Sequence, residues 1–167
     1  FLGNWEGDLM LLHDMARKLD PPADRIDDMV EWVNLRQKAV DDARRDTPHH
    51  HVRIYYYAEV NHVRRAMEGR PTFTNNVLPR VNVDYVSYSS YDCQEGDLAA
   101  ALSYIESKLA PKKGIEGKRV FLGEYGFPAI RCTPQQQDER SRRVLKKAIA
   151  WGCPFVLYWE MYNNEID

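Results

Sequence analysis

Five apolar runs divide this chain, and each of them ends in an acidic residue. The acids, in chain order, are Glu6, Glu59, Asp92, Glu124 and Glu160. Parallel strands that are buried on both faces have continuous apolar sequences, and ligands bind beyond the carboxyl ends of such strands. The pattern therefore predicts parallel strands that carry their terminal carboxylates to one shared edge of a sheet.

Stretches with a helical spacing of apolar residues separate these runs. The clearest predicts a helix over 24–46, and a second is expected over 96–109. A third helix is predicted to end at Trp151, with Thr133 as its N-cap and Pro134 as its first helical residue. Strand and helix thus alternate along most of the chain.

The remaining segments are strands and loops. Residues 7–19 predict a loop with a short helical piece, and residues 61–81 predict an irregular loop of a length that is usually functional or an insertion. Beyond the opening run, which ends at Glu6, the predicted strands cover 51–58, 83–88, 119–123 and 154–159.

This order of elements predicts an α/β fold with a parallel sheet, either a doubly wound sheet or a barrel. No glycine-rich phosphate loop follows a strand, so the barrel is favoured over a nucleotide-binding sheet. The chain has 167 residues, which suffices for one domain but not for an eight-stranded barrel of about 250 residues. We therefore interpret residues 1–167, which open directly inside an apolar run, as a single domain that forms the C-terminal portion of a (β/α)8 barrel.

Composition and charge restrict the classes of partner expected for this chain. The formal net charge is −2, and the basic residues of 140–147 fall on one face of a predicted helix, so nucleic acid is not an expected partner. No apolar stretch approaches the roughly 20 residues of a membrane span, so no membrane partner is expected. The three cysteines and the triplet His49–His51 lack metal-site spacing, so no metal is expected. The compartment stays open; an extracellular or periplasmic location is compatible with the sequence.

Four segments of the chain resemble a known family. The segments FLGNWEGD (1–8), DYVSYSSYD (84–92), VFLGEYGFP (120–128) and FVLYWEMYN (155–163) are similar to the C-terminal part of clan A glycoside hydrolases, the cellulase-like (β/α)8 superfamily. The resemblance aligns the first run with barrel strand 4, the fourth run with strand 7 and the fifth run with strand 8.

The resemblance implies a role for particular residues. Glu6 matches the general acid/base, Glu124 the nucleophile and Trp159 the aromatic platform, while Tyr88 or Tyr91 matches the strand-6 aromatic region beside the nucleophile. The expected substrate-binding residues are Trp5, Glu59, Asn61, Tyr88, Tyr91 and Trp159.

Some assignments around these residues stay open. In the family the asparagine directly precedes the glutamate, and adjacent strand residues face opposite sides. Here Trp5 separates Asn4 from Glu6, and residues two apart face the same side. Unless a bulge shifts the register, Asn4 is therefore not expected to take the role of the family's asparagine. Glu59 is expected either to bind a sugar hydroxyl or to pair with Arg64. Asp92 and Glu160, together with Tyr162 and Asn163, are further candidates for lining the cleft.

The expected chemistry is hydrolysis of β-linked glycosides with retention. One carboxylate attacks the anomeric carbon, and the other donates a proton to the leaving oxygen, so no cofactor is required. One alternative is a non-catalytic carbohydrate-binding or scaffold barrel, and another is a barrel enzyme that combines carboxylates with a metal. The truncated barrel is expected to be poorly active alone and to self-associate through its strand edges.

Overall fold

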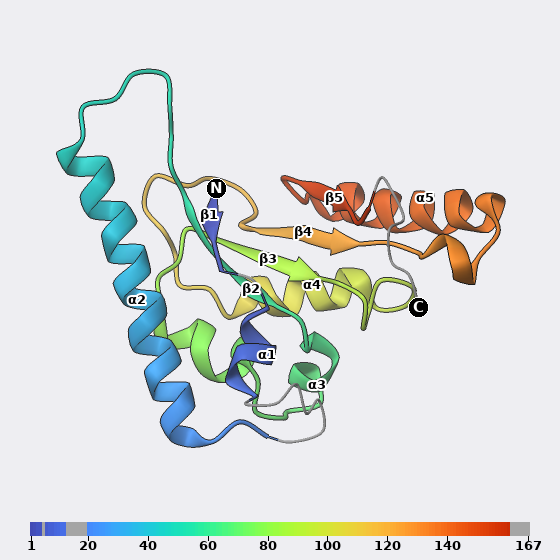
Figure 1. The fold of residues 1–167 in the computed structure, drawn as a ribbon, viewed down its shortest axis with the longest axis horizontal. Coiled ribbons are helices and arrows are strands. Elements are labelled where there is room, and N and C mark those ends of the chain that lie inside the picture. The colour runs from blue at the N-terminus through green and yellow to red at the C-terminus, as the bar shows by residue number, and fades with distance from the viewer. Residues whose placement is uncertain (5, 13–19, 161–167) are drawn as a thin grey trace.

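The computed structural model describes residues 1–4, 6–12 and 20–160, and its centre is a parallel sheet of five strands (Figure 1). The strands follow chain order, and each pairs in parallel with the next. They are β1 (Leu2–Gly3), β2 (Tyr56–Val60), β3 (Tyr85–Ser89), β4 (Val120–Tyr125) and β5 (Val156–Tyr158). The sheet curls into a half-barrel with helices between the strands, which confirms a partial α/β barrel.

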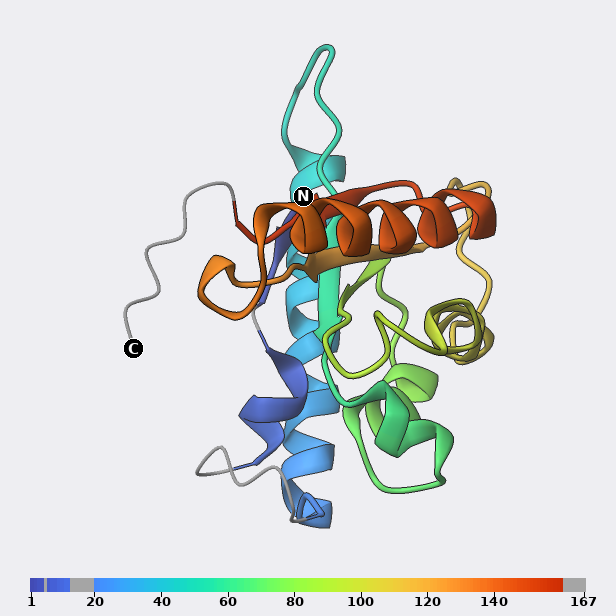
Figure 2. The same cartoon turned by 90° about the vertical axis from the view of Figure 1, so that its right-hand side faces the viewer.

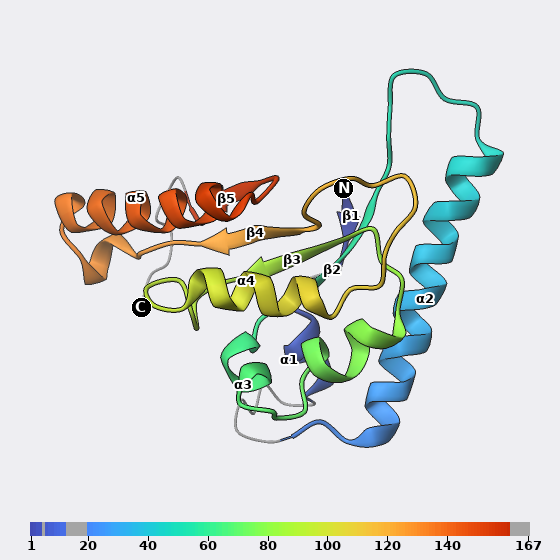
Figure 3. The same cartoon turned by 180° about the vertical axis from the view of Figure 1, so that it is seen from behind.

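In the described residues, five α-helices accompany the sheet. They are α1 (Gly7–Leu11), α2 (Ala23–Asp46), α3 (Val63–Met67), α4 (Leu98–Ser107) and α5 (Pro134–Trp151). Seen from behind, α4 lies in front of β3 (Figure 3), and the view turned by 90° shows α5 crossing in front of the upper strands and α4 to the right (Figure 2). The main core lies between these helices and the convex face of the sheet, where Tyr56, Val86 and Leu122 are fully buried.

The long helices form as their apolar spacing predicts. In α2, Met29, Val33 and Val40 recur at helical spacing and are buried in the core, which explains a 24-residue helix of otherwise polar sequence. Helix α5 begins at a capping box in which the Thr133 side chain accepts a hydrogen bond from Gln136 N and the Gln136 side chain accepts one from Thr133 N. The predicted start and end of α5 are confirmed.

The concave face of the sheet is aromatic at the amino ends of the strands. The ring of Phe1 lies 5.0 Å from that of Tyr85 and 4.9 Å from that of Phe155, and Phe121 packs against Tyr57 at 5.5 Å. These rings alternate along the strands with the residues of the convex core. Phe1 and Phe155 retain exposed area, so the concave face is a second apolar surface that only partly excludes water.

The segment 61–81 corrects the prediction of an irregular loop. It contains α3, a π-helical turn η1 (Phe73–Val77) and a 3₁₀ turn (Leu78–Arg80). Asn75 Nδ2 donates 2.8 Å hydrogen bonds to the carbonyls of Ala66 and Arg70, and Thr72 Oγ1 accepts the Asn75 N–H. The polar residues that suggested a loop are instead the side chains that satisfy the turn backbone.

Strand boundaries also differ from the prediction, most clearly at β2 and β4. The second strand was expected over 51–58 but begins only at Tyr56, because residues 51–54 are exposed and do not pair with β1. The fourth strand continues past Gly123 through Glu124 to Tyr125. The added residues matter, because they place Glu124 inside the strand and in register with Ser89 of β3.

Candidate active site

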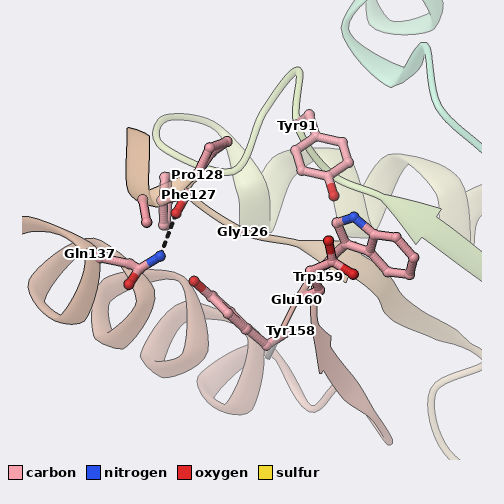
Figure 4. Close-up of a pocket in the computed structure, with 9 residues that line it drawn as sticks. Tyr91, Gly126, Phe127, Pro128, Gln137, Tyr158, Trp159 and Glu160 are labelled. Carbon is pink, nitrogen blue, oxygen red and sulfur yellow. Dashed lines mark hydrogen bonds between the residues drawn. The ribbon is translucent and has the colours of Figure 1, made fainter. Parts of the chain in front are cut away.

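The carboxyl ends of the strands carry two adjoining pockets. One is lined by Glu6, Asn61, His62, Ser89, Tyr91 and Asp92, together with Leu9. The other is lined by Tyr91, Phe127, Pro128, Tyr158, Trp159 and Glu160, with neighbouring residues of the loop after β4 (Figure 4). Tyr91 lines both pockets, and the pair of pockets is termed the cleft. Ligands of parallel α/β folds bind at this end of the strands.

Glu59 lies beneath the first of these pockets. The side chain projects from β2, and only 4% of the residue is exposed. Its Oε1 accepts hydrogen bonds from Ser89 Oγ at 3.0 Å, from the backbone N–H of Glu6 at 3.2 Å and from Asn61 Nδ2 at 3.3 Å. The prediction that Glu59 pairs with Arg64 is wrong, since Arg64 donates to Asp92 instead.

The protonation of Glu59 is shifted by this environment. Burial raises the pKa of the Glu59 carboxyl group to about 7, and the negative charge of Glu124 adds to the shift. The hydrogen bonds from Ser89, Glu6 and Asn61 favour the ionised form of Glu59. They therefore lower its pKa and offset part of the increase. At neutral pH, the site therefore holds a carboxyl group that is balanced between its neutral and ionised forms.

Glu124 lies on β4, which β3 separates from the strand of Glu59. Tyr91 donates a hydrogen bond from its hydroxyl to Glu124 Oε2 at 3.2 Å, which links the loop after β3 to the end of β4. Burial raises the pKa of Tyr57, and the charges of both Glu59 and Glu124 raise it further. The two carboxylates thus act on one phenol of the concave face, as expected for groups that share a site.

Glycine at position 123 is required by the side chain opposite. A Cβ atom there would lie 1.8 Å from Ser87 Oγ. Ser87 Oγ in turn lies 3.5 Å from Glu59 Oε2, so β2, β3 and β4 are in close contact directly below the acids. A side chain at position 123 would meet Ser87 and disturb the contact between β3 and β4 directly below Glu124.

Glu6 lies at the turn between β1 and α1. Its backbone is left-handed, with φ 52° and ψ 60°, an unusual conformation for a residue with a side chain. Asn4 is buried and accepts a hydrogen bond from the hydroxyl of Tyr56, a residue of the convex core. Asn4 contacts the convex core whereas Glu6 lines the cleft, although residues two positions apart on a regular strand would face the same side. The left-handed turn at Glu6 accounts for the difference. Trp5, a predicted substrate contact, lies outside the described residues.

Trp159 follows β5 and lies beside Tyr91. It is 49% exposed, its backbone N–H donates to the Tyr125 carbonyl at 2.8 Å, and its own carbonyl lies against Gly126, where a Cβ atom would approach to 1.8 Å. In Figure 4 the Tyr91 hydroxyl points toward Trp159. The structure therefore brings both predicted aromatic contacts to the same pocket, with Glu160 next to them.

One expected substrate contact, Tyr88, takes another place. Tyr88 is fully buried in the convex core and donates its hydroxyl hydrogen bond to Asp92, so it does not reach the cleft where it was predicted. Residues on one strand alternate between faces, and Tyr88 shares the convex face with Val86 while Ser87 and Ser89 face the acids. Tyr162 and Asn163 lie outside the described residues.

One buried acid was missed from the sequence. Asp8, at the start of α1, is 2% exposed and accepts the N–H groups of Asn61 at 2.8 Å, His62 at 3.2 Å and Phe73 at 2.8 Å. These bonds fix the turn after β2 that forms one wall of the cleft. No local signal distinguishes Asp8, because its partners are more than 50 residues away in the chain.

The described part of the chain contains neither a metal-binding cluster nor a membrane-spanning helix. Within residues 1–4, 6–12 and 20–160, no group of three or more His, Cys, Asp or Glu side chains is arranged to hold a metal ion. Within the same ranges, no helix is long and apolar enough to cross a membrane. His49, His50 and His51 are exposed beyond the end of α2.

The chain was compared with known proteins in three ways. No family model, curated protein or solved structure matches it.

Proposed function

We propose that this chain is the strand-4-to-strand-8 portion of a (β/α)8 glycoside hydrolase of clan A that cleaves β-linked glycosides with retention. In this proposal β1 to β5 correspond to the last five barrel strands, and the cleft at their carboxyl ends is the sugar-binding site. The observation that supports it most directly is the cleft itself, in which Glu6 lines the pocket beside Tyr91, Tyr91 binds Glu124, and exposed Trp159 lies alongside.

The chemistry assigns one step to each carboxyl group. The Glu124 carboxylate attacks the anomeric carbon as the glycosidic C–O bond breaks, and the Glu6 carboxyl group gives its proton to the leaving oxygen. Glu6 then takes a proton from water, whose oxygen attacks the anomeric carbon and releases Glu124. Trp159 offers an apolar ring face to a sugar, and the hydroxyl of Tyr91 favours the ionised form of the nucleophile by donating to it.

The decisive experiment compares the chain with its Glu124→Gln variant on aryl β-glycosides of several sugars. We expect turnover by the parent chain to exceed that of the variant by about 10⁴-fold, with sugar affinity retained, because the variant keeps the shape of the site but loses the nucleophile. Glu116→Gln, which removes the same charge from an exposed loop, is the matched control and should leave turnover unchanged. Measurable turnover that is equal in the parent chain and in Glu124→Gln would refute the proposal.

The alternative is a non-catalytic carbohydrate-binding barrel. The exposed aromatic pair Tyr91 and Trp159 is the observation that favours it, because stacking surfaces bind sugars without any acid chemistry. This function predicts saturable sugar binding that Trp159→Ala abolishes and Glu124→Gln leaves intact, without hydrolysis by either protein. A third function, a metal-assisted barrel enzyme, predicts turnover that a chelator abolishes.

A further inference from the structure

The buried carboxyl group of Glu59 lies where three separate parts of the cleft meet. Ser89 belongs to β3, Asn61 follows β2 and Glu6 precedes α1, yet all three donate to the same oxygen, Glu59 Oε1. With 4% of the residue exposed, Glu59 is covered by the groups that line the cleft. A side chain in this position acts on substrate only through its neighbours.

The hydrogen bond from the Glu6 N–H indicates the role of Glu59. Glu6 adopts a left-handed backbone conformation that few residues with a side chain adopt, and such strain persists only where surrounding contacts hold it. The Glu6 N–H donates to Glu59 Oε1 at 3.2 Å, and Glu6 O accepts from Met10 N at 3.0 Å in the first turn of α1. The direction of the Glu6 side chain into the cleft therefore depends on a hydrogen bond to a residue 53 positions away.

We propose that Glu59 is the positioning residue of this site, holding the turn that carries Glu6 so that the Glu6 carboxyl group faces the cleft. This role takes the place of the sugar contact expected from the sequence, and it rests on the proposed function of Glu6 as the acid/base. Because Oε1 accepts three hydrogen bonds, the proton of the neutral form belongs on Oε2, whose neighbour is Ser87 Oγ at 3.5 Å. In both protonation states Glu59 Oε1 accepts the hydrogen bond from the Glu6 N–H, and this bond is stronger when Glu59 is ionised.

The charged groups around Glu59 set how its proton responds to pH. From the turn before α1 comes Glu6, from the segment after β2 comes His62, and from the loop after β3 come Tyr91 and Asp92. Glu124 acts from β4, and Tyr57 lies beside both acids on the concave face. His62 is the one group in this set that can carry a positive charge. Ionisation of Glu59 thus adds a negative charge to an already acidic cleft, consistent with its pKa of about 7.

The test uses the backbone amide of Glu6, observed by ¹H–¹⁵N NMR in the ¹⁵N-labelled protein. We expect its proton resonance to move downfield as pH rises, with a midpoint near the pKa of Glu59, about 7, because a carboxylate is the stronger acceptor. In Glu59→Gln this titration should disappear, while the resonance stays close to its position in the parent protein at low pH. A Glu6 amide that does not titrate, or one that titrates identically in Glu59→Gln, overturns the proposal.

Activity then separates the positioning role from the function of the site. Relative to the parent chain, Glu59→Gln should retain most turnover because its amide oxygen still accepts from Glu6, and Glu59→Ala should lose about 100-fold in kcat with little change in KM. Ser89→Ala, which removes one donor and leaves Glu59 in place, is the variant to use if Glu59→Ala fails to fold. A titrating Glu6 amide, together with measurable hydrolysis that is equal in the parent chain and in Glu124→Gln, would uphold the positioning role and reject the glycosidase function.

Discussion

The hydroxyl of Tyr91 donates a hydrogen bond to Oε2 of Glu124 across 3.2 Å, joining two residues that are 33 positions apart in the chain. Tyr91 lies in the loop after β3 and borders both pockets of the cleft, whereas Glu124 is in register with Ser89 on the neighbouring strand. A donor from a separate loop thus fixes the carboxylate proposed as nucleophile. The contact gives the first prediction.

Tyr91→Phe should lower the turnover of aryl β-glycosides about 10- to 100-fold. The substitution removes one hydrogen bond to a charged group, which contributes about 1.5–3 kcal/mol, and keeps the ring that borders the sugar pocket. Steady-state kinetics on the parent chain and the variant provide the measurement. Because Tyr91 is exposed, the melting temperature should stay the same, and a large drop in melting temperature would assign Tyr91 a structural role instead.

Glu59→Gln should change how stability depends on pH. Because the pKa of Glu59 rises on folding from 4.5 to about 7, its contribution to stability is fully present below pH 4.5 and is lost as pH rises toward about 7. The loss amounts to about 3 kcal/mol, which the variant does not undergo. Urea unfolding of both proteins between pH 4.5 and 8 should therefore show the parent falling relative to Glu59→Gln. Parallel pH curves would argue that Glu59 titrates normally.

Asp84→Asn should destabilise the opposite end of the sheet by about 3 kcal/mol. Asp84 is 1% exposed and contacts Arg44 at 3.1 Å and Lys112 at 3.3 Å, while Tyr56 N donates to it at 3.0 Å. Burial alone would raise the pKa of Asp84, but the bonds from Tyr56 and Gln37 and the charges of Lys112 and Arg44 lower it.

The sign of its pH dependence follows from that lowered pKa. The contribution of Asp84 is present above pH 3.8 and is lost as pH falls through its folded pKa. The difference in unfolding free energy between parent and Asp84→Asn should therefore be largest near neutral pH and shrink in acid. A difference that grows in acid would contradict the assignment. This dependence runs opposite to that of Glu59, so the two variants act as controls for each other.

Gly123→Ala should destabilise the fold by about 1–3 kcal/mol, because its Cβ would lie 1.8 Å from Ser87 Oγ. The double variant Gly123→Ala/Ser87→Gly should recover much of this loss, since it removes the opposing side chain. Gly96→Ala, where no heavy atom lies within 4 Å of the new Cβ, is the matched control and should change stability by less than about 0.5 kcal/mol. Equal effects at positions 96 and 123 would show that close packing between β3 and β4 is not the cause.

Local signals in the sequence located most of the elements. The apolar stripe of α2 and the Thr133–Gln136 cap of α5 depend on neighbours within a few residues, and both formed where the sequence predicts. The sequence predicts a loop over 61–81 because the segment contains two prolines, a glycine and the adjacent pair Asn75 and Asn76. Asn75 donates to the carbonyls of Ala66 and Arg70, and Thr72 Oγ1 accepts the Asn75 N–H, so these residues support helical turns through bonds that composition alone does not reveal.

The sequence by itself determined that five apolar runs end in acids and that strands and helices alternate, because strand and helix periodicity are local properties. Only the tertiary structure decided that Glu59 is buried beneath the cleft, that Tyr88 belongs to the convex core and that Tyr91 binds Glu124. Desolvation and hydrogen bonding set the state of a carboxyl group, and both depend on which distant residues surround it. For Glu59 two of these neighbours are Glu6 and Ser89, 53 and 30 residues away, and the fold alone brings them to the same oxygen.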